Sequence, residues 1–184
     1  MARIFIAIRF NEEFKQTLVG LQEALKNKSV EGNYCPYGNL HMTLAFIGED
    51  YDLTEIHRAI SEVEFAPFTI TLDKLGMFPT KAGVIWCGIK EQTEITALAD
   101  KIRERLTAHD ISFNTKMFVP HISLVQHPSL VVTDIEVPKV TIRIERIFVL
   151  KSERIDGKLI YSEYLVKQYN KEPYEVSASD IIKT

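Results

Sequence analysis

Two short segments carry residue types that can transfer protons, and they share one pattern. The tetrapeptides HMTL (residues 41–44) and HISL (residues 121–124) both read histidine, apolar residue, hydroxyl residue, leucine. Each begins a strand-like apolar run, and the two occupy comparable places in the two halves of the chain. The repetition indicates a diverged internal duplication.

Strand geometry explains why this spacing matters. Successive side chains of a β-strand alternate between its two faces. Strict alternation therefore predicts that His41 and Thr43 share one face, with Met42, Leu44 and Phe46 on the opposite, buried face. The second tetrapeptide repeats the arrangement. Two such strands facing each other would place two imidazoles and two hydroxyls around one cleft.

That set of groups suits an in-line displacement at phosphorus. An imidazole with an ordinary pKa of about 6.5 can accept or donate a proton near neutral pH. One of His41 and His121 can deprotonate the attacking water while the other protonates the departing oxygen. The Thr43 and Ser123 hydroxyls can donate hydrogen bonds to the non-bridging oxygens. The scheme needs no metal and no cofactor.

The surrounding sequence predicts an α+β fold. Strands and helices alternate without the regular rhythm of a parallel sheet, and Asp156-Gly157 is a good hairpin turn. Asn11 and Asp52 or Thr54 are candidate helix N-caps. The expected strands are 3–10, 41–47, 68–75, 84–89, 119–125, 140–150 and 159–166, and the expected helices begin near residues 12, 53 and 93. Residues 32–36 are predicted to form a loop.

Composition narrows the class of protein. The 184 residues are 46% hydrophobic and 26% charged, with a net charge of −3, which excludes a protein that coats nucleic acid by bulk charge. Cys35 and Cys87 are too few for a disulfide framework and are expected to be reduced packing residues. Arg9 interrupts the first apolar run well short of the about 20 residues of a membrane span. We expect a cytoplasmic monomer that does not bind membranes.

The chain resembles the 2H phosphoesterases, specifically the RNA 2′,3′-cyclic phosphodiesterases also called 2′-5′ RNA ligases. The resemblance rests on the two tetrapeptides together with RIFIAIRF, LAFIGE, GVIWCGI, the Val119-Pro120 lead-in to the second motif, and the ending LKSERIDGKLIYSEYLV. It covers residues 1 to about 168. We therefore expect one domain over 1–168, followed by a polar tail over 169–184.

The resemblance implies a bilobal, pseudo-symmetric fold with two antiparallel sheets lining a central cleft and helices on the outside. It also implies metal-independent hydrolysis of a 2′,3′-cyclic phosphate at an RNA end to a 2′-phosphate, with weak 2′-5′ ligation as the reverse reaction. It assigns His41 as the proton donor and His121 as the proton acceptor. The residues alone leave these two roles interchangeable.

Three further residues are candidates for binding the substrate. The family commonly has an arginine two positions after the leucine of the second motif, where this chain has Gln126. An amide there leaves the phosphate without one cation, and Arg9 is a candidate to supply charge at the cleft. Tyr37 precedes the first motif and is a candidate to stack on a base.

Other interpretations stay open. The substrate can be a small cyclic nucleotide or a 2′-5′ oligonucleotide instead of an RNA end, or the chain can be a non-catalytic module that binds RNA ends. A zinc site is disfavoured because the chain lacks closely spaced ligands such as histidines at i and i+4. His57 and His109 are expected to be structural or solvated.

Overall fold

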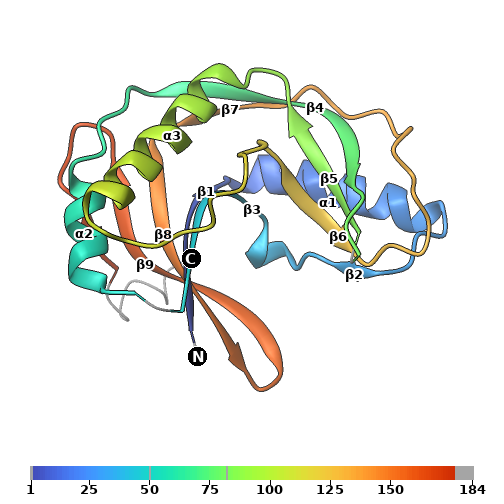
Figure 1. Cartoon of the computed structure of the whole chain (residues 1–184). Helices are drawn as coiled ribbons and strands as arrows, with labels where there is room; N and C mark the ends of the chain where they lie inside the picture. The colour runs from blue at the N-terminus through green and yellow to red at the C-terminus, as the bar shows by residue number, and fades with distance from the viewer. Residues whose placement is uncertain (1, 50, 82, 177–184) are drawn as a thin grey trace.

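Two five-stranded antiparallel sheets form the centre of the molecule in the computed structural model (Figure 1), which describes residues 2–49, 51–81 and 83–176. Sheet A has the strand order β10-β9-β8-β1-β3, and sheet B has the order β2-β6-β5-β4-β7. The prediction of an α+β fold with two antiparallel sheets is confirmed.

Ten strands, three α-helices and one 3-10 helix make up the described part of the chain. In chain order they are β1 (Arg3–Arg9), α1 (Glu12–Asn27), β2 (Asn33–Tyr34), η1 (Tyr37–Asn39), β3 (His41–Gly48), α2 (Leu53–Ser61), β4 (Phe68–Phe78), β5 (Val84–Ile89), α3 (Thr93–Ala108), β6 (Ile122–Gln126), β7 (Thr141–Ile144), β8 (Arg146–Ile155), β9 (Lys158–Gln168) and β10 (Tyr174–Glu175).

The predicted helix starts are correct. The Asn11 side chain accepts a hydrogen bond from the backbone N–H of Phe14 at 3.0 Å, which caps α1. Asp52 caps α2 in the same way by accepting from the N–H groups of Thr54 and Glu55, so Asp52 rather than Thr54 is the N-cap. These bonds satisfy donors that have no partner inside the helix.

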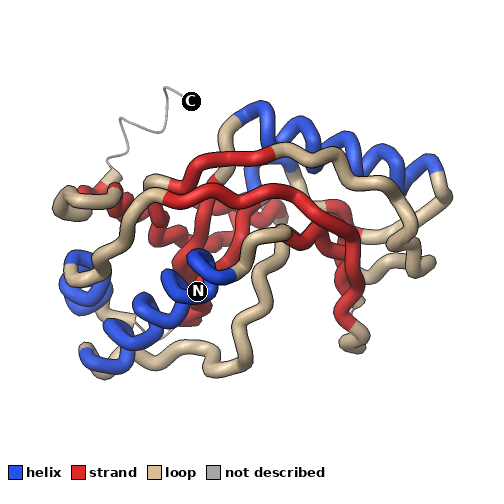
Figure 2. The backbone as a smooth tube through the Cα atoms, turned by 90° about the horizontal axis from the view of Figure 1, so that it is seen from above, coloured by secondary structure: helices blue, strands red, loops and turns tan. Residues whose placement is uncertain are grey.

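The helices lie on the outer sides of the sheets, as Figure 2 shows from above. Helix α1 contacts β6 of sheet B, whereas α2 contacts β9 and α3 contacts β3, both of sheet A. Side chains from both sheets and all three helices form one continuous apolar core. This shared core holds the two sheets in a fixed relation to each other.

Three predicted boundaries are wrong. Residues 140–150 are two strands in different sheets: β7 pairs with β4, and β8 pairs with β1 and β9, with Glu145 between them. A local apolar pattern carries no information about which sheet a strand joins. The expected loop 32–36 contains the short strand β2, which pairs with β6. The expected strand 119–125 begins only at Ile122.

The start of the expected polar tail extends sheet A. Within 169–176, β10 pairs with β9, and the N–H of Val176 donates to the carbonyl of Tyr164. Residues 177–184 lie outside the described residues. Both cysteines are free thiols, and burial raises the pKa of each to about 12.

The indole of Trp86 depends on a glycine in the neighbouring strand. Gly76 on β4 is paired with Trp86 on β5, and a Cβ at Gly76 would lie 2.2 Å from Cζ2 of the indole. Since real contacts are never this close, any larger residue at position 76 must displace the ring. Gly76 therefore permits Trp86 to lie flat across sheet B.

We expect Gly76→Ala to destabilise the protein by about 1–3 kcal/mol, the usual cost of overpacking. Gly20→Ala is the matched control, because nothing lies within 4 Å of a Cβ there and alanine favours a helix interior over glycine. Urea unfolding of both variants checks this. A Gly76→Ala protein as stable as the wild type would contradict it.

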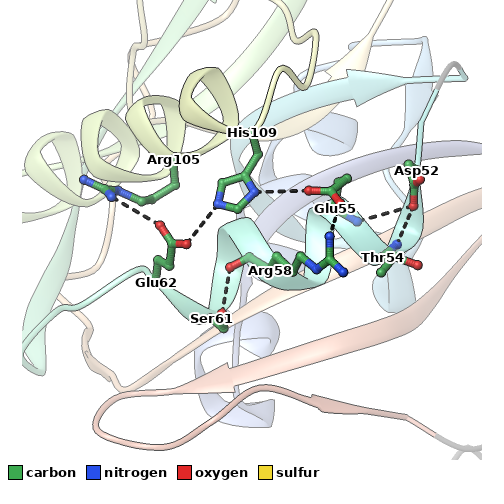
Figure 3. A network of polar contacts seen from close by, with 8 residues as sticks. All are labelled: Asp52, Thr54, Glu55, Arg58, Ser61, Glu62, Arg105 and His109. Atoms are coloured by element: carbon green, nitrogen blue, oxygen red, sulfur yellow. Dashed lines mark hydrogen bonds and ion pairs between the residues drawn. The ribbon is translucent and has the colours of Figure 1, made fainter.

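A histidine joins the two helices that cover sheet A. His109 follows the last residue of α3, and its Nδ1 lies 3.2 Å from Oε2 of Glu55 while its Nε2 lies 3.0 Å from Oε1 of Glu62 (Figure 3). Arg105 also pairs with Glu62 at 3.3 Å. The hydrogen bonds to the two carboxylates raise the pKa of His109 above its ordinary value.

This contact predicts a pH-dependent contribution to stability. A pKa that is higher in the folded than in the unfolded chain gives stabilisation that is fully present below about pH 6.5 and disappears as the pH rises through the raised value. We expect the difference in melting temperature between the wild type and His109→Gln to be larger at pH 5.5 than at pH 8.5. An equal difference at both pH values would show that the contact is not ionic.

Candidate active site

The two histidine motifs lie on neighbouring strands of different sheets. His41 opens β3, the edge strand of sheet A, and His121 immediately precedes β6, which has only the two-residue β2 beyond it in sheet B. Strands β3 and β6 contact each other, and Figure 1 shows them side by side at the centre of the molecule. The fold thus brings the two motifs to the junction of the sheets.

Both imidazoles are held by the same backbone device. Nδ1 of His41 lies 2.6 Å from the carbonyl oxygen of Asn39, and Nδ1 of His121 lies 2.7 Å from that of Val119. A carbonyl oxygen only accepts hydrogen bonds, so Nδ1 is the protonated nitrogen in each ring. Each Nε2 is therefore the atom that exchanges a proton.

The two rings differ in how Nε2 is engaged. Nε2 of His41 lies 2.9 Å from Oγ1 of Thr43, two residues further along the same strand face. The hydroxyl donates to Nε2 when the imidazole is neutral and accepts from it when the imidazole is charged. His121 and Ser123 are not joined in this way among the described contacts. The first motif thus has an internal side-chain hydrogen bond for which the described contacts of the second give no counterpart.

Aromatic rings surround both histidines. His41 packs against Phe5 with ring centres 5.0 Å apart and meets Tyr161 edge-on at 5.3 Å. His121 meets Phe78 edge-on at 4.7 Å and lies 6.5 Å from the ring of Trp86. Such rings exclude water from one side of each imidazole, which disfavours its charged form.

Burial accordingly lowers the pKa of both imidazoles. The pKa of His41 falls to about 4, chiefly through desolvation, with the Asn39 carbonyl opposing the shift. Positive charge at His121 and at Arg9 lowers the pKa of His41 further, which places both groups within electrostatic reach. Burial also lowers the pKa of His121, and the Val119 carbonyl opposes that shift. Both histidines are neutral at pH 7 in the substrate-free protein.

An identical irregularity follows each motif. On β3, Thr43 pairs with Ala7 and Phe46 with Phe5, so four residues oppose three and the strand bulges at Leu44–Ala45. The prediction that Phe46 lies on the buried face is therefore wrong. Phe46 shares the face of His41 and Thr43 and is 37% exposed.

The bulge in β6 has the same consequence for Gln126. Ser123 pairs with Trp86 and Gln126 with Val84, which moves Gln126 to the face that carries Ser123 and Trp86. Gln126 is exposed there. An uncharged amide thus occupies the cleft-facing position where the resemblance calls for arginine.

The chain is similar to known proteins of one family. The family model described as the 2′-5′ RNA ligase superfamily matches residues 20–156. The RNA 2′,3′-cyclic phosphodiesterase of Thermotoga maritima is 30% identical over 162 residues, 82% of this chain and 86% of the relative. The protein of the same name from Archaeoglobus fulgidus is 34% identical over 112 residues, which are 56% of this chain and 61% of the relative.

The chain belongs to the 2′-5′ RNA ligase superfamily. Several solved structures share the fold of this chain at low sequence identity. Escherichia coli LigT complexed with 3′-AMP superposes with a TM-score of 0.76 at 21% identity, over 92% of this chain and 98% of that one. TT0787 of Thermus thermophilus superposes with a TM-score of 0.78 at 22% identity, over 92% and 99%.

Arg9, one of the predicted substrate-binding residues of this superfamily member, lies beside the motif. It pairs across the sheet with His41, and its Nη1 donates to Oε1 of Glu163 at 2.6 Å. Tyr37 is held elsewhere: its hydroxyl donates to the Glu12 carboxylate, and Nζ of Lys15 lies 5.0 Å from the ring centre. Both partners belong to α1, so the described contacts of Tyr37 are not with either histidine.

Three aromatic residues beside the histidines were not predicted from the sequence. Phe5, Phe78 and Tyr161 contact the histidines from β1, β4 and β9, far from the motifs along the chain. Phe5 and Tyr161 also belong to a small apolar cluster on this face of sheet A, separate from the main core. The signal available was alternation along Ile4-Phe5-Ile6, which marks Phe5 as facing away from the core residues beside it.

Three further features of the described residues concern other kinds of site. No helix among them is long and apolar enough to cross a membrane. Within 2–49, 51–81 and 83–176, no three His, Cys, Asp or Glu side chains are grouped so as to hold a metal ion. A cavity of about 510 Å³ lies between α3 and the β4–β7 edge of sheet B and is lined by neither motif histidine.

The electrostatics predict how the histidines titrate. In proton NMR we expect the ring signal of His41 to shift with a midpoint near pH 4 and that of His121 below pH 6.5, because burial disfavours both charged forms. His109 is expected to titrate above pH 6.5. Single His→Gln variants assign the signals. A midpoint for His41 at or above pH 6.5 would contradict the described burial.

Proposed function

We propose that this protein hydrolyses the 2′,3′-cyclic phosphate at an RNA end to a 2′-phosphate, with His41 and His121 as the proton-transfer pair. The observation that carries the proposal is the matched pair of imidazoles on β3 and β6, each with Nδ1 bound to the carbonyl two residues earlier and Nε2 left for chemistry. The names of the Thermotoga and Archaeoglobus relatives support the same reaction.

The proposed step is one in-line displacement. Neutral Nε2 of His121 accepts a proton from water as the water oxygen forms its bond to phosphorus. The bond from phosphorus to the 3′ oxygen breaks on the opposite side, and Nε2–H of His41 gives that oxygen its proton. The products are a 2′-phosphate and a free 3′ hydroxyl, and the histidines exchange their protons with solvent. Ligation is the same displacement with the 5′ hydroxyl of a second RNA in place of water, and it gives a 2′-5′ phosphodiester and a free 3′ hydroxyl.

The hydroxyl groups have a separate proposed task. Thr43 and Ser123 donate hydrogen bonds to the non-bridging oxygens, where negative charge grows in the transition state. Oγ1 of Thr43 is bound to Nε2 of His41 in the substrate-free protein and turns to the phosphate when the substrate binds. This exchange frees Nε2 of His41 for the leaving oxygen.

Proton uptake accompanies substrate binding in this mechanism. A base must be neutral and an acid must be charged, yet the pKa of both histidines is lowered. The phosphodiester carries a negative charge, which raises the pKa of an imidazole beside it. Substrate binding thus favours protonation of His41, which later donates this proton to the leaving oxygen of the substrate. His121 is already neutral and can act as the base.

Gln126 favours a second candidate within the same chemistry. It brings an amide rather than a cation to the cleft face, which suits a substrate with fewer negative charges, such as a small cyclic nucleotide. Assaying 2′,3′-cyclic AMP beside a short RNA with a 2′,3′-cyclic end decides between the two. A protein that binds RNA but turns over neither would instead be a non-catalytic RNA-end binding module.

The first test is hydrolysis of the short RNA in the presence of EDTA, with analysis of the product. We expect a 2′-phosphate from the wild type and a fall in kcat of at least about 100-fold in His41→Ala and in His121→Ala, the usual contribution of a general acid or base. His57→Ala on α2 is the matched control and should keep wild-type activity. Loss of activity in EDTA would contradict the metal-independent mechanism.

A substrate with sulfur in place of the 3′ oxygen tests the assignment of roles. A thiolate leaves without being protonated, so the variant that lacks the acid should regain activity on this substrate while the variant that lacks the base should not. We expect recovery in His41→Ala only. Recovery in His121→Ala instead would reverse the two roles.

A further inference from the structure

A second cavity lies on the same face of sheet A as His41, at the far end of the strands. It encloses about 270 Å³ and is lined by Arg3 of β1, Ser152 and Arg154 of β8, and Leu159 of β9, among others. It sits near the base of the β8–β9 hairpin, which projects from the body of the molecule in Figure 1.

The strand register places this cavity on the face that carries the motif. Arg3 pairs with Ser152, and Ser152 pairs with Tyr161, the residue whose ring meets His41 edge-on. Directly paired residues of antiparallel strands point to the same face. The positive charge of Arg3 also acts on the Tyr161 hydroxyl, lowering its pKa against the larger effect of burial. One continuous surface therefore runs from His41 through Tyr161 to Arg3.

Two guanidinium groups and two carboxylates line this cavity. Among the described residues, no carboxylate lies within ion-pair distance of Arg3 or Arg154. Of the acidic residues that line the cavity, Glu49 follows the end of β3, and Glu153 pairs with Lys151 at 3.0 Å. Nη1 of Arg154 donates a hydrogen bond to the Gly157 carbonyl at 3.3 Å, and the other N–H groups of this guanidinium are available to a ligand. Planar guanidinium groups bind phosphate oxygens through two donors at once.

An exposed aromatic ring lies between the histidine and the cavity. Phe46 is 37% exposed, and the bulge turns it to the face of His41. Its ring reaches toward Gly48, where an added Cβ would lie 3.9 Å from Cε1. Aromatic rings beside a cationic groove are the usual elements of a surface for single-stranded nucleic acid, since any base can stack on them.

From these observations we infer that Arg3 and Arg154 bind an upstream phosphodiester of the RNA chain, so that the protein favours oligonucleotides over mononucleotides. This inference rests on the proposed function and names its substrate class. Arg9, opposite His41, and Arg3 are six positions apart on β1, which corresponds to about 20 Å. A stacked strand rises about 3.4 Å per nucleotide and needs about six nucleotides to span that distance, and an extended strand needs fewer.

The test measures kcat/KM for 2′,3′-cyclic AMP and for oligoadenylates of two to eight nucleotides that end in a 2′,3′-cyclic phosphate. We expect kcat/KM of the wild type to rise on the order of tenfold with length and to level off by about six nucleotides. In the double variant Arg3→Gln/Arg154→Gln, the octamer-to-mononucleotide ratio should fall toward one. The dependence of its kcat/KM on salt, plotted as log kcat/KM against log salt concentration, should become less steep by about 0.7, the contribution of one lost phosphate contact.

Arg143→Gln is the matched control, because Arg143 is an exposed strand arginine on β7 of sheet B whose Nε lies 2.6 Å from Glu145. It should keep the wild-type ratio, and circular dichroism checks that all variants are folded. A wild type that hydrolyses every length equally well, or a double variant that keeps the length dependence, would overturn the inference and leave the proposed function standing. A wild type that hydrolyses none of these substrates would overturn the proposed function itself.

Discussion

The burial of apolar side chains from both sheets in one core is the constraint on which the site depends. Each motif strand is anchored in that core by the two apolar residues of its tetrapeptide. These are Met42 and Leu44 in β3 and Ile122 and Leu124 in β6, and each is at most 1% exposed. Burying such a side chain contributes about 1.5–3 kcal/mol. The histidines and hydroxyl residues of the motifs belong to strands that are held in place by these buried side chains. The packing of the core therefore sets the separation of the two histidines.

The same packing sets the chemistry of the histidines. Phe5 and Tyr161 on one side, and Phe78 and Trp86 on the other, remove water from the imidazoles and lower their pKa. A carbonyl bonded to Nδ1 works in the opposite direction because it stabilises the charged form. The outcome is a pair of imidazoles that are neutral at pH 7 when the site is empty, each with a defined tautomer.

Local sequence features predicted what depends on local physics. The N-caps at Asn11 and Asp52 and the starts of the three helices follow from residue type and period, and the structure has them where they were expected. The positions of Phe46 and Gln126 were not accessible in this way, because a bulge changes the face of every later residue and arises from pairing with a distant strand. The division of 140–150 between two sheets has the same origin, since Glu145 ends one pairing and precedes another.

The asymmetry between the two sheets bears on the proposed roles of the two histidines. Matched histidines on β3 and β6 are chemically interchangeable, so their roles depend on which way the substrate lies between them. In a 2′,3′-cyclic phosphate the leaving 3′ oxygen belongs to the RNA, and the attacking water must approach phosphorus from the side opposite that oxygen. Sheet A extends past its histidine through Phe46 to the arginine-lined cavity, whereas β6 ends at Gln126, with only β2 beyond it in sheet B. An RNA chain that lies along sheet A puts its 3′ oxygen on the side of His41 and leaves the side of His121 to water. The inferred placement of the chain thus favours, without use of the resemblance, the proposed roles of His41 as the acid and His121 as the base.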